Sequence, residues 1–287
     1  MSFIDLQLDL ELVQGLAELE LTNATDIQRQ AIPAILDGGD LLASAPTGAG
    51  KTLAFALPAL QHLLDTGDKP SDSARVLILS PTRELALQTH NTIQKVAQLT
   101  ELRSTLLVGG SPYGPQQADL EKGTDVIVAT PGRLVELIER EWVDLSIINF
   151  FIVDEADRML DMGFIESVYS IVKELPKARQ TLMFSATLEH SAIDKFAGQI
   201  LNDTSRTITL APPRGVPAHI KQSVFFADND DHKAAILDAL LQKGVTQAIL
   251  FVSSRKQVDH WVEFMHKRDI YCVSLHGDLK QGERTER

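Results

Sequence analysis

Residues 45–52 read Ala45-Pro46-Thr47-Gly48-Ala49-Gly50-Lys51-Thr52, after a short apolar run and before a helix-like segment. Glycines at 48 and 50 let backbone N–H groups turn toward phosphate oxygens, and the following helix directs its positive end at them. Lys51 would neutralise the β- and γ-phosphates of a nucleotide, and the Thr52 hydroxyl would bind Mg²⁺. The alternative is an ordinary glycine-rich turn before a helix. The position between a predicted strand and a predicted helix favours a phosphate-binding loop.

An acidic cluster, Asp154-Glu155-Ala156-Asp157, directly follows the apolar run 150–153. An Asp at the carboxyl end of a strand can hold a metal ion, and a neighbouring Glu can orient or deprotonate the attacking water. Alone, such a cluster is more often a solvated acidic turn. Because phosphoryl transfer needs a phosphate cradle, a metal ligand and a water-positioning group together, the cluster and the loop at 45–52 predict a nucleoside-triphosphate hydrolase.

Short apolar runs alternate with helix-like segments through most of the chain. The runs are 40–44, 76–79, 106–108, 126–128, 150–153 and 181–184, and the helix-like segments are 12–19, 27–36, 53–64, 84–99, 133–139 and 165–174. Strands that are apolar on both faces and alternate with helices indicate a parallel sheet covered on both sides. The pattern predicts an α/β fold with a three-layer lobe.

Residues 202–218 contain Pro212, Pro213, Gly215 and Pro217 and interrupt this alternation. We interpret the region 202–218 as interdomain, and we place the boundaries of the linker between the two predicted lobes at 211 and 218. The pattern then restarts. Strand-like runs are expected at 220–227, 248–252 and 271–275, and helices near 232–242 and 256–266. The predicted units are 1–36, 37–210 and 219–287, and the last is shorter than a typical independent domain.

The composition bounds what the motifs can mean. A chain of 287 residues with 44% apolar content exceeds one typical domain. Its net charge of -12 is opposite to the basic footprint of many nucleic-acid binders, so any contact with RNA must be local. The single Cys272 excludes an internal disulfide, and no apolar stretch approaches the roughly 20 residues needed to cross a bilayer. A soluble cytoplasmic protein is expected.

Six short motifs occur in a fixed order, and together they carry a family resemblance. They are Ala45 to Thr52, Pro81-Thr82-Arg83-Glu84-Leu85-Ala86, Gly109-Gly110, Thr130-Pro131-Gly132-Arg133, Asp154 to Asp157 and Ser185-Ala186-Thr187. In this order they resemble the DEAD-box ATP-dependent RNA helicases. The resemblance implies two RecA-like lobes of the P-loop NTPase fold, joined by a linker, with ATP and RNA bound across the cleft between them.

The resemblance also implies residue roles. It places Lys51, Asp154 and Glu155 in ATP hydrolysis, with Ser185 and Thr187 coupling hydrolysis to RNA release. The nucleotide would contact Ala45, Thr47, Gly48, Ala49, Gly50, Lys51 and Thr52, and Mg²⁺ would be held by Thr52 and Asp154. The RNA backbone would run along Pro81, Thr82, Arg83, Gly109, Gly110, Thr130, Gly132 and Arg133.

The two arginines have a physical interpretation beside the resemblance. Arg83 and Arg133 follow predicted strands and have small or hydroxyl-bearing neighbours, so guanidinium, hydroxyl and backbone N–H groups are suited to consecutive phosphates. Alternatively, both arginines open surface helices and pair with nearby carboxylates. The glycine pair has its own alternative as a plain turn.

Phe3 and Gln28 resemble the adenine-recognition motif of the family, and this assigns residues 1–36 to that role. The Gln28 amide can donate to and accept from one adenine edge, and Phe3 can stack on the ring. The match departs at Glu20-Leu21 and Ala24, where the family usually has Gly-Phe and a Pro. The alternatives are a core phenylalanine and a solvated helical glutamine.

The second lobe resembles only the opening segments of its counterpart in the family. Gln281 and Arg284 match a spacing that contacts RNA in relatives, although a plain surface helix explains them almost as well. No segment like Ala-Arg-Gly-Ile-Asp or His-Arg-x-Gly-Arg-x-x-Arg occurs before Arg287. Because the family's arginine finger lies there, we expect a fragment that binds nucleotide and hydrolyses it weakly.

The segments 44–52, 57–65 and 154–164 resemble the bacterial SrmB-type branch of the family, which acts in ribosome assembly. That branch implies RNA and ribosomal-assembly proteins as partners. Two other classes of protein stay open: an ATP-dependent DNA translocase with the same phosphate machinery, and a catalytically silent RNA-binding scaffold. Discrimination of RNA from DNA rests on contacts to the 2′-hydroxyl, which no sequence displays.

Overall fold

A computed structural model describes residues 1–66, 73–187, 191–210, 220–279 and 281–286. The chain divides into two compact units, Met1–Arg214 and Gly215–Arg287, and each is described by itself. The predicted linker at 211–218 lies outside the described residues, so that boundary stays a prediction.

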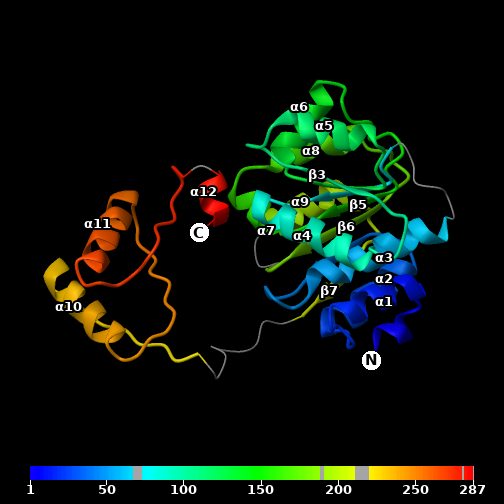
Figure 1. Ribbon diagram of the computed structural model, residues 1–287. Coiled ribbons are helices and arrows are strands. Elements are labelled where there is room, and N and C mark those ends of the chain that lie inside the picture. Colours follow the sequence, from blue (N-terminus) through cyan, green and yellow to red (C-terminus); the bar gives the residue numbers. More distant parts are fainter. Residues whose placement is uncertain (67–72, 188–190, 211–219, 280, 287) are drawn as a thin grey trace. The chain divides into compact units, whose positions relative to one another are not determined.

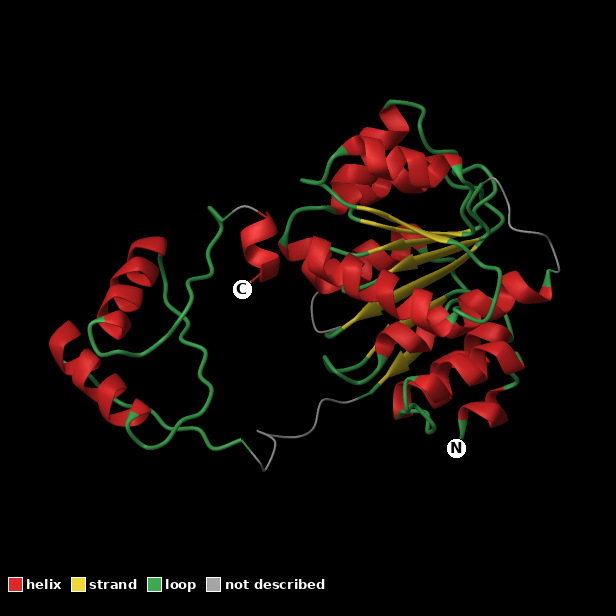
Figure 2. Ribbon diagram, in the orientation of Figure 1, coloured by secondary structure: helices red, strands yellow, loops and turns green. Residues whose placement is uncertain are grey.

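The first unit is built on a seven-stranded sheet in which every pair of neighbouring strands is parallel (Figure 1, Figure 2). The strand order is β3-β4-β2-β5-β6-β1-β7. The strands are β1 (Leu41–Ser44), β2 (Val76–Leu79), β3 (Ser104–Leu107), β4 (Val126–Ala129), β5 (Phe150–Val153), β6 (Gln180–Ser185) and β7 (Arg206–Thr209).

Helices cover both faces of this sheet. They are the 3₁₀-helix η1 (Phe3–Leu6), α1 (Leu10–Glu18), α2 (Asp26–Leu36), α3 (Lys51–Asp65), α4 (Arg83–Val96), α5 (Tyr113–Glu121), α6 (Pro131–Glu139), α7 (Ala156–Asp161), α8 (Ile165–Glu174) and α9 (Ser191–Ile200). Successive side chains of a strand point to opposite faces. Accordingly, Val76 and Ile78 of β2 join one apolar core with α1 to α4, and Leu77 and Leu79 join the other core with α6 to α9. The predicted three-layer α/β fold is confirmed.

The interpretation of the whole of 202–218 as linker is wrong at residues 206–209. These residues form β7, which pairs with β1 from Leu41 opposite Arg206 to Ser44 opposite Thr209. As an edge strand β7 is largely exposed, so its sequence Arg-Thr-Ile-Thr lacks the apolar run that marks a buried parallel strand.

Asp40 fastens the amino ends of three strands together. Its buried carboxylate accepts hydrogen bonds from the backbone N–H of Thr181 at 2.7 Å and of Asn202 at 2.8 Å. Its backbone carbonyl accepts a third from the N–H of Arg206 at 2.9 Å. One side chain therefore ties β1 to β6 and to the segment that leads into β7.

Asp40→Ala should lower the free energy of unfolding by about 2–4 kcal/mol, because it leaves two backbone donors without an acceptor where water is largely excluded. Urea unfolding at pH 7 measures the change. The matched control is Asp37→Ala, which removes an exposed carboxylate that pairs with Arg206 at 3.2 Å and should cost less than about 1 kcal/mol. Equal effects of the two substitutions would contradict the role of Asp40.

The second unit contains α10 (Asp230–Leu241), α11 (Arg255–His266) and α12 (Gln281–Glu286). The two helices predicted near 232–242 and 256–266 are confirmed. The strand-like runs at 220–227, 248–252 and 271–275 form no strand in the described part of this unit. Apolar residues favour a strand only when a neighbouring strand takes up their backbone hydrogen bonds.

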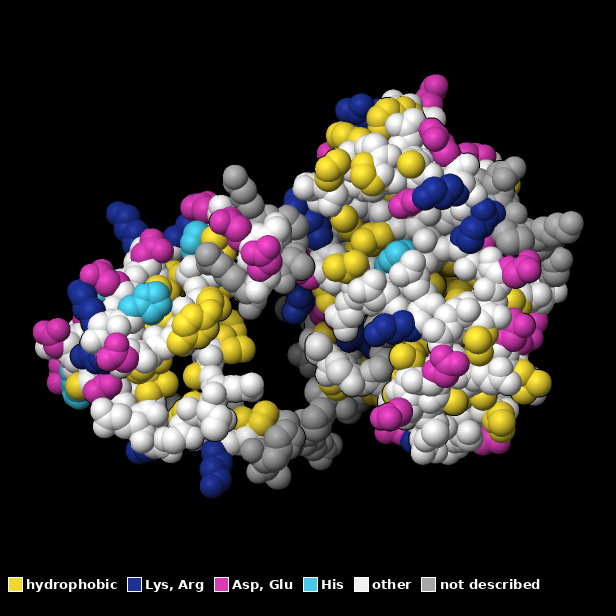
Figure 3. All heavy atoms as spheres, in the orientation of Figure 1, with side chains coloured by type: hydrophobic (Ala, Val, Ile, Leu, Met, Phe, Trp, Pro, Cys, Tyr) yellow, Lys and Arg dark blue, Asp and Glu magenta, His cyan; other side chains and the backbone are white. Residues whose placement is uncertain are grey.

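The apolar side chains of these runs lie at the surface of the second unit, where they appear in yellow (Figure 3). Phe226 and Phe251 are each 88% exposed, and Tyr271 is 89% exposed. The core of the unit is correspondingly small. Among its described hydrophobic residues, Trp261 and Met265 of α11 are buried.

Candidate functional site

The motifs identified in the sequence follow the carboxyl ends of five strands. The loop at 45–50 follows β1, residues 80–82 follow β2, 108–112 follow β3, Thr130 follows β4, and 154–155 follow β5. Because the strands are parallel, their carboxyl ends share one edge of the sheet, which is where ligands bind in open α/β folds.

The predicted phosphate loop curls around its own lysine. Gly48 and Gly50 have φ values of +82° and +92°, a backbone conformation that glycine adopts without strain. The Lys51 side chain is buried, and its Nζ donates a hydrogen bond to the Ala45 carbonyl at 2.8 Å. Thr52 follows in the first turn of α3 and is half-buried. The predicted residues Ala45, Thr47, Gly48, Ala49, Gly50, Lys51 and Thr52 therefore form one continuous loop and helix start.

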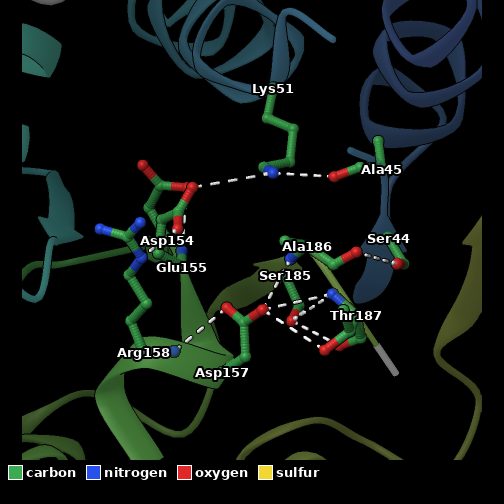
Figure 4. Close-up of polar contacts among 10 residues, drawn as sticks. All are labelled: Ser44, Ala45, Lys51, Asp154, Glu155, Asp157, Arg158, Ser185, Ala186 and Thr187. Carbon is green, nitrogen blue, oxygen red and sulfur yellow. Dashed lines mark hydrogen bonds and ion pairs between the residues drawn. The ribbon is translucent and has the colours of Figure 1, made fainter. Parts of the chain in front are cut away.

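Lys51 faces the acidic cluster at the end of β5 (Figure 4). Its Nζ lies 3.7 Å from Oε1 of Glu155, whose Oε2 pairs with Nε of Arg158 at 3.2 Å. Asp154 and Glu155 are both buried, and Glu155 has a φ of 52°. A non-glycine residue in this conformation costs free energy and occurs preferentially at functional sites.

Burial and the neighbouring Glu155 raise the pKa of Asp154 to about 7, against the opposing effect of Lys51. Burial therefore disfavours the charged carboxylate of Asp154, and a bound cation would favour it. A hydroxyl at Thr52 and a carboxylate at Asp154 are oxygen donors of the kind that Mg²⁺ prefers. Mg²⁺ usually takes only one or two carboxylates besides the phosphates of its substrate. The residues present therefore fit a nucleotide-bound Mg²⁺.

Asp157 joins the acidic cluster to the predicted coupling residues. Its Oδ2 accepts from the backbone N–H of Ala186 and of Thr187, each at 3.2 Å, and from the Thr187 hydroxyl at 3.5 Å (Figure 4). The Ser185 hydroxyl donates to the Thr187 carbonyl at 2.6 Å. Ser44, at the end of β1, donates to the Ala186 carbonyl at 3.4 Å. A chain of hydrogen bonds thus runs from α7 through residues 185–187 to β1.

Gln28 is tied to the phosphate loop. Its Nε2 donates to the Gly50 carbonyl at 3.0 Å, and its Oε1 accepts from the backbone N–H of Thr25 at 2.9 Å. Phe3 is only 2% exposed and belongs to the core beneath α1 and α2. The structure therefore favours the core alternative for Phe3, and its stacking on adenine stays a prediction without support from this geometry.

Three of the predicted RNA motifs meet at the ends of β2, β3 and β4. Gly110 has a φ of +73°, and a Cβ added there would lie 2.0 Å from the Arg83 guanidinium. The Gly109 N–H donates to the Thr130 hydroxyl at 3.4 Å. Thr82 caps α4 by accepting from the Leu85 N–H at 3.2 Å, and Pro81 beside it is buried.

The side chain of Arg133 is buried, whereas the predicted phosphate contact requires an accessible guanidinium. Its side chain is 5% exposed, its Nη1 and Nη2 each donate to the Ser111 carbonyl at 3.2 Å, and its Nε donates to Glu136 at 2.9 Å. The guanidinium also lies 4.2 Å from the centre of the Tyr113 ring. The alternative, pairing with a nearby carboxylate, describes Arg133 better than direct phosphate contact. Gly132, beside it in the first turn of α6, is half-buried.

Gln281 and Arg284 lie on α12 of the second unit. Arg284 is exposed, and the side chain of Gln281 lies outside what the structure describes. Their place beside the other predicted RNA residues stays a prediction.

Sequence reasoning did not select Asp157, Gln116 or Tyr113 as site residues. Asp157 stands in the acidic motif itself, which was the available signal. Gln116 and Tyr113 carry no motif. Gln116 contacts residues 108 and 112 of the loop before its helix, and Tyr113 contacts Arg133, which only the fold brings near.

A cavity of about 380 Å³ lies elsewhere, beside Ala74, Leu120, Thr124, Ile127 and Trp142. None of the predicted site residues lines it. Across the part of the chain that is described, every helix is too short or too polar to span a membrane.

Comparisons with known proteins agree with this geometry. The family model described as DEAD/DEAH box helicase matches residues 25–196, and the helicase conserved C-terminal domain matches 232–287. The chain is 42% identical to the ATP-dependent RNA helicase SrmB of Escherichia coli and 39% identical to that of Haemophilus influenzae. Each match covers 99% of this chain and 64% of the relative, so the chain spans less than two thirds of either protein.

Solved structures show the same fold. Saccharomyces cerevisiae Dbp5 bound to RNA and ADP BeF3 matches with a TM-score of 0.85 at 31% identity, over 99% of this chain and 71% of that one. A DEAD box protein from Methanococcus jannaschii matches with a TM-score of 0.67 at 29% identity, over 100% of this chain and 76% of that one. The predicted RecA-like fold class is therefore confirmed. With the phosphate loop, the acidic cluster and residues 185–187 gathered on one sheet edge, the chain belongs to the DEAD/DEAH box helicase family.

Proposed function

We propose that this chain carries the nucleotide site and part of the RNA track of an ATP-dependent RNA helicase. The protein would couple ATP binding and hydrolysis to local unwinding of RNA duplexes. The observation that carries the proposal is the position of Lys51, whose Nζ lies between the Ala45 carbonyl of the phosphate loop and the carboxylate of Glu155. The similar proteins named ATP-dependent RNA helicases support the same activity.

The residues of the site divide the work of hydrolysis. Lys51 and the N–H groups of the loop bind the phosphates, and Thr52 and Asp154 would hold Mg²⁺, which neutralises phosphate charge when bound. Glu155 is the group placed to orient the attacking water and accept its proton. Gln28 lies against the loop, where its amide donates to the Gly50 carbonyl, and we assign it to recognition of the base.

The hydrogen bonds of Asp157 support a coupling role for Ser185 and Thr187. Because Asp157 follows Glu155 by two residues, a shift of the acidic cluster during hydrolysis would be passed to the backbone of residues 186 and 187. Such a link gives ATP hydrolysis a route to the RNA-binding surface.

We further propose that the protein acts in the cytoplasm, in ribosome assembly or other RNA metabolism, with ribosomal-assembly proteins among its partners. The support is the likeness to the SrmB helicases over 99% of the chain.

Steady-state ATP hydrolysis with single-stranded RNA or single-stranded DNA of matched length tests the proposed function. In a protein with both lobes complete, we expect RNA to stimulate hydrolysis well beyond DNA, whereas residues 1–287 alone should hydrolyse ATP weakly. Equal stimulation by both would favour a DNA translocase, and RNA binding without any hydrolysis would favour a silent scaffold.

A further inference from the structure

The loop at 108–112, between β3 and α5, is held at both ends by one buried side chain. Gln116 of α5 is 6% exposed. Its Oε1 accepts from the Val108 N–H at 3.0 Å, while its Nε2 donates to the carbonyls of Val108 at 3.2 Å and of Pro112 at 3.1 Å. Residues 108–112 have left the sheet, and the Gln116 amide supplies the backbone hydrogen bonds that a neighbouring strand would otherwise make.

Arg133 holds the middle of the same loop. All three of its donor nitrogens are engaged inside the protein, two on the Ser111 carbonyl and one on Glu136. Tyr113 stacks on the guanidinium and donates its hydroxyl to the same Glu136 oxygen at 2.8 Å. Because its side chain is only 5% exposed, Arg133 presents little surface to a phosphate.

The shape of the loop determines where its neighbours lie. Gly109 is fixed to Thr130, and a Cβ at Gly110 would displace the end of the Arg83 side chain. A displaced loop would therefore move the backbone N–H groups of 109–111. Because these donors are neutral, losing them lowers RNA affinity and leaves the salt slope unchanged.

We propose that Gln116 and Arg133 are positioning residues that hold residues 109–111 in the shape that meets the RNA backbone, and that Arg133 itself makes no phosphate contact. The inference rests on the proposed RNA-binding function. It assigns Arg133 a role different from the one that its motif implies, and it gives Gln116 a role that no motif indicates.

The salt dependence of RNA binding distinguishes a positioning role of Arg133 from direct contact with a phosphate. Each phosphate contact with single-stranded nucleic acid contributes about 0.7 to the slope of log affinity against log salt. Arg133→Gln should weaken binding of a fluorescent single-stranded RNA by about tenfold or more, and the slope should stay parental because no phosphate contact is removed. A slope flatter by about 0.7 would show direct phosphate contact and overturn the proposal.

Arg133→Lys provides the second measurement. It keeps the charge but loses the two-pronged contact with Ser111 and the planar stacking on Tyr113. RNA affinity should remain low in this variant if Arg133 positions the loop. Full rescue by lysine would identify a simple charge contact. The matched control is Arg140→Gln, which removes an exposed guanidinium 4.6 Å from the same Tyr113 ring and should leave RNA affinity near parental.

Gln116→Met tests the other support, since methionine keeps the length of the side chain and removes all three hydrogen bonds. RNA affinity should fall by about tenfold or more with the salt slope unchanged. The matched control is Gln117→Met on the same helix, where the side-chain amide donates only to Glu121 at 3.1 Å. Parental RNA affinity in Gln116→Met would overturn the proposal.

ATP affinity and thermal unfolding are measured in every variant, because they report the fold independently of the loop. If Gln116→Met fails to fold, the Arg133 pair still decides between positioning and contact. The proposed function fails separately, and takes this inference with it, if the parental chain binds no RNA at all.

Discussion

In a protein with both lobes complete, Glu155→Gln should leave ATP affinity close to parental and slow steady-state hydrolysis by about 10²–10⁴-fold, the usual contribution of a positioned general base. The substitution keeps the size of the side chain. It removes the carboxylate that can accept a proton from water. Lys51, at 3.7 Å, and Arg158, at 3.2 Å, are both donors, so the amide oxygen can accept from one of them.

Nucleotide titration and initial-rate ATPase assays together test this expectation. The control is Asp161→Asn, which neutralises an exposed carboxylate at the end of α7 and should change neither quantity appreciably. Parental turnover in Glu155→Gln would exclude Glu155 as the base. A loss of ATP binding of the same size as the loss of rate would show that Glu155 maintains the site instead of acting in the reaction.

Lys51→Ala should weaken ATP binding by about 10- to 100-fold. A hydrogen bond to a charged group contributes roughly 1.5–3 kcal/mol, and about 1.4 kcal/mol corresponds to a tenfold change in affinity. The substitution also removes a cation that faces the buried carboxylates of Asp154 and Glu155, which adds repulsion toward an incoming polyphosphate.

The test compares ATP with AMP in a fluorescence titration. AMP lacks the β- and γ-phosphates that Lys51 is placed to bind, so its affinity should change much less than that of ATP. Lys177→Ala, at an exposed site, serves as the control. Equal losses for ATP and AMP would mean that the substitution had collapsed the loop, and unchanged ATP binding would contradict the assignment of Lys51.

The buried strands of the fold were predictable from the sequence, because a strand that is buried on both faces appears as a continuous apolar run. The bounds of β2 and β5 match the expected runs at 76–79 and 150–153 residue for residue. β7 was missed because an edge strand needs only one neighbour and little apolar surface. The runs 248–252 and 271–275 were expected as strands on composition, yet a strand also requires a partner for its backbone, which composition cannot reveal.

The candidate site was predictable where function requires residues close together in the chain. The loop at 45–52 and the cluster at 154–157 are of this kind, and the structure brings them face to face. Buried polar side chains were not predictable in the same way. Arg133 finds its partner in the loop at 108–112, more than twenty residues earlier, and Gln116 bonds the same loop just before its own helix. The same residue types at the surface would give an indistinguishable sequence.

The pairing of β1 determines when the nucleotide site can form during synthesis. β1 pairs on one side with β6, where Leu41 lies opposite Leu182, and on the other with β7, where it lies opposite Arg206. Pairings so distant along the chain are slow to close, and domains fold as they emerge from the ribosome. The strand that precedes the phosphate loop therefore stays unpaired, with apolar residues exposed, until residues near 185 have left the exit tunnel. Until then the nascent chain has an ATP-binding sequence but no ATP-binding site, and it depends on whatever shields its apolar segments.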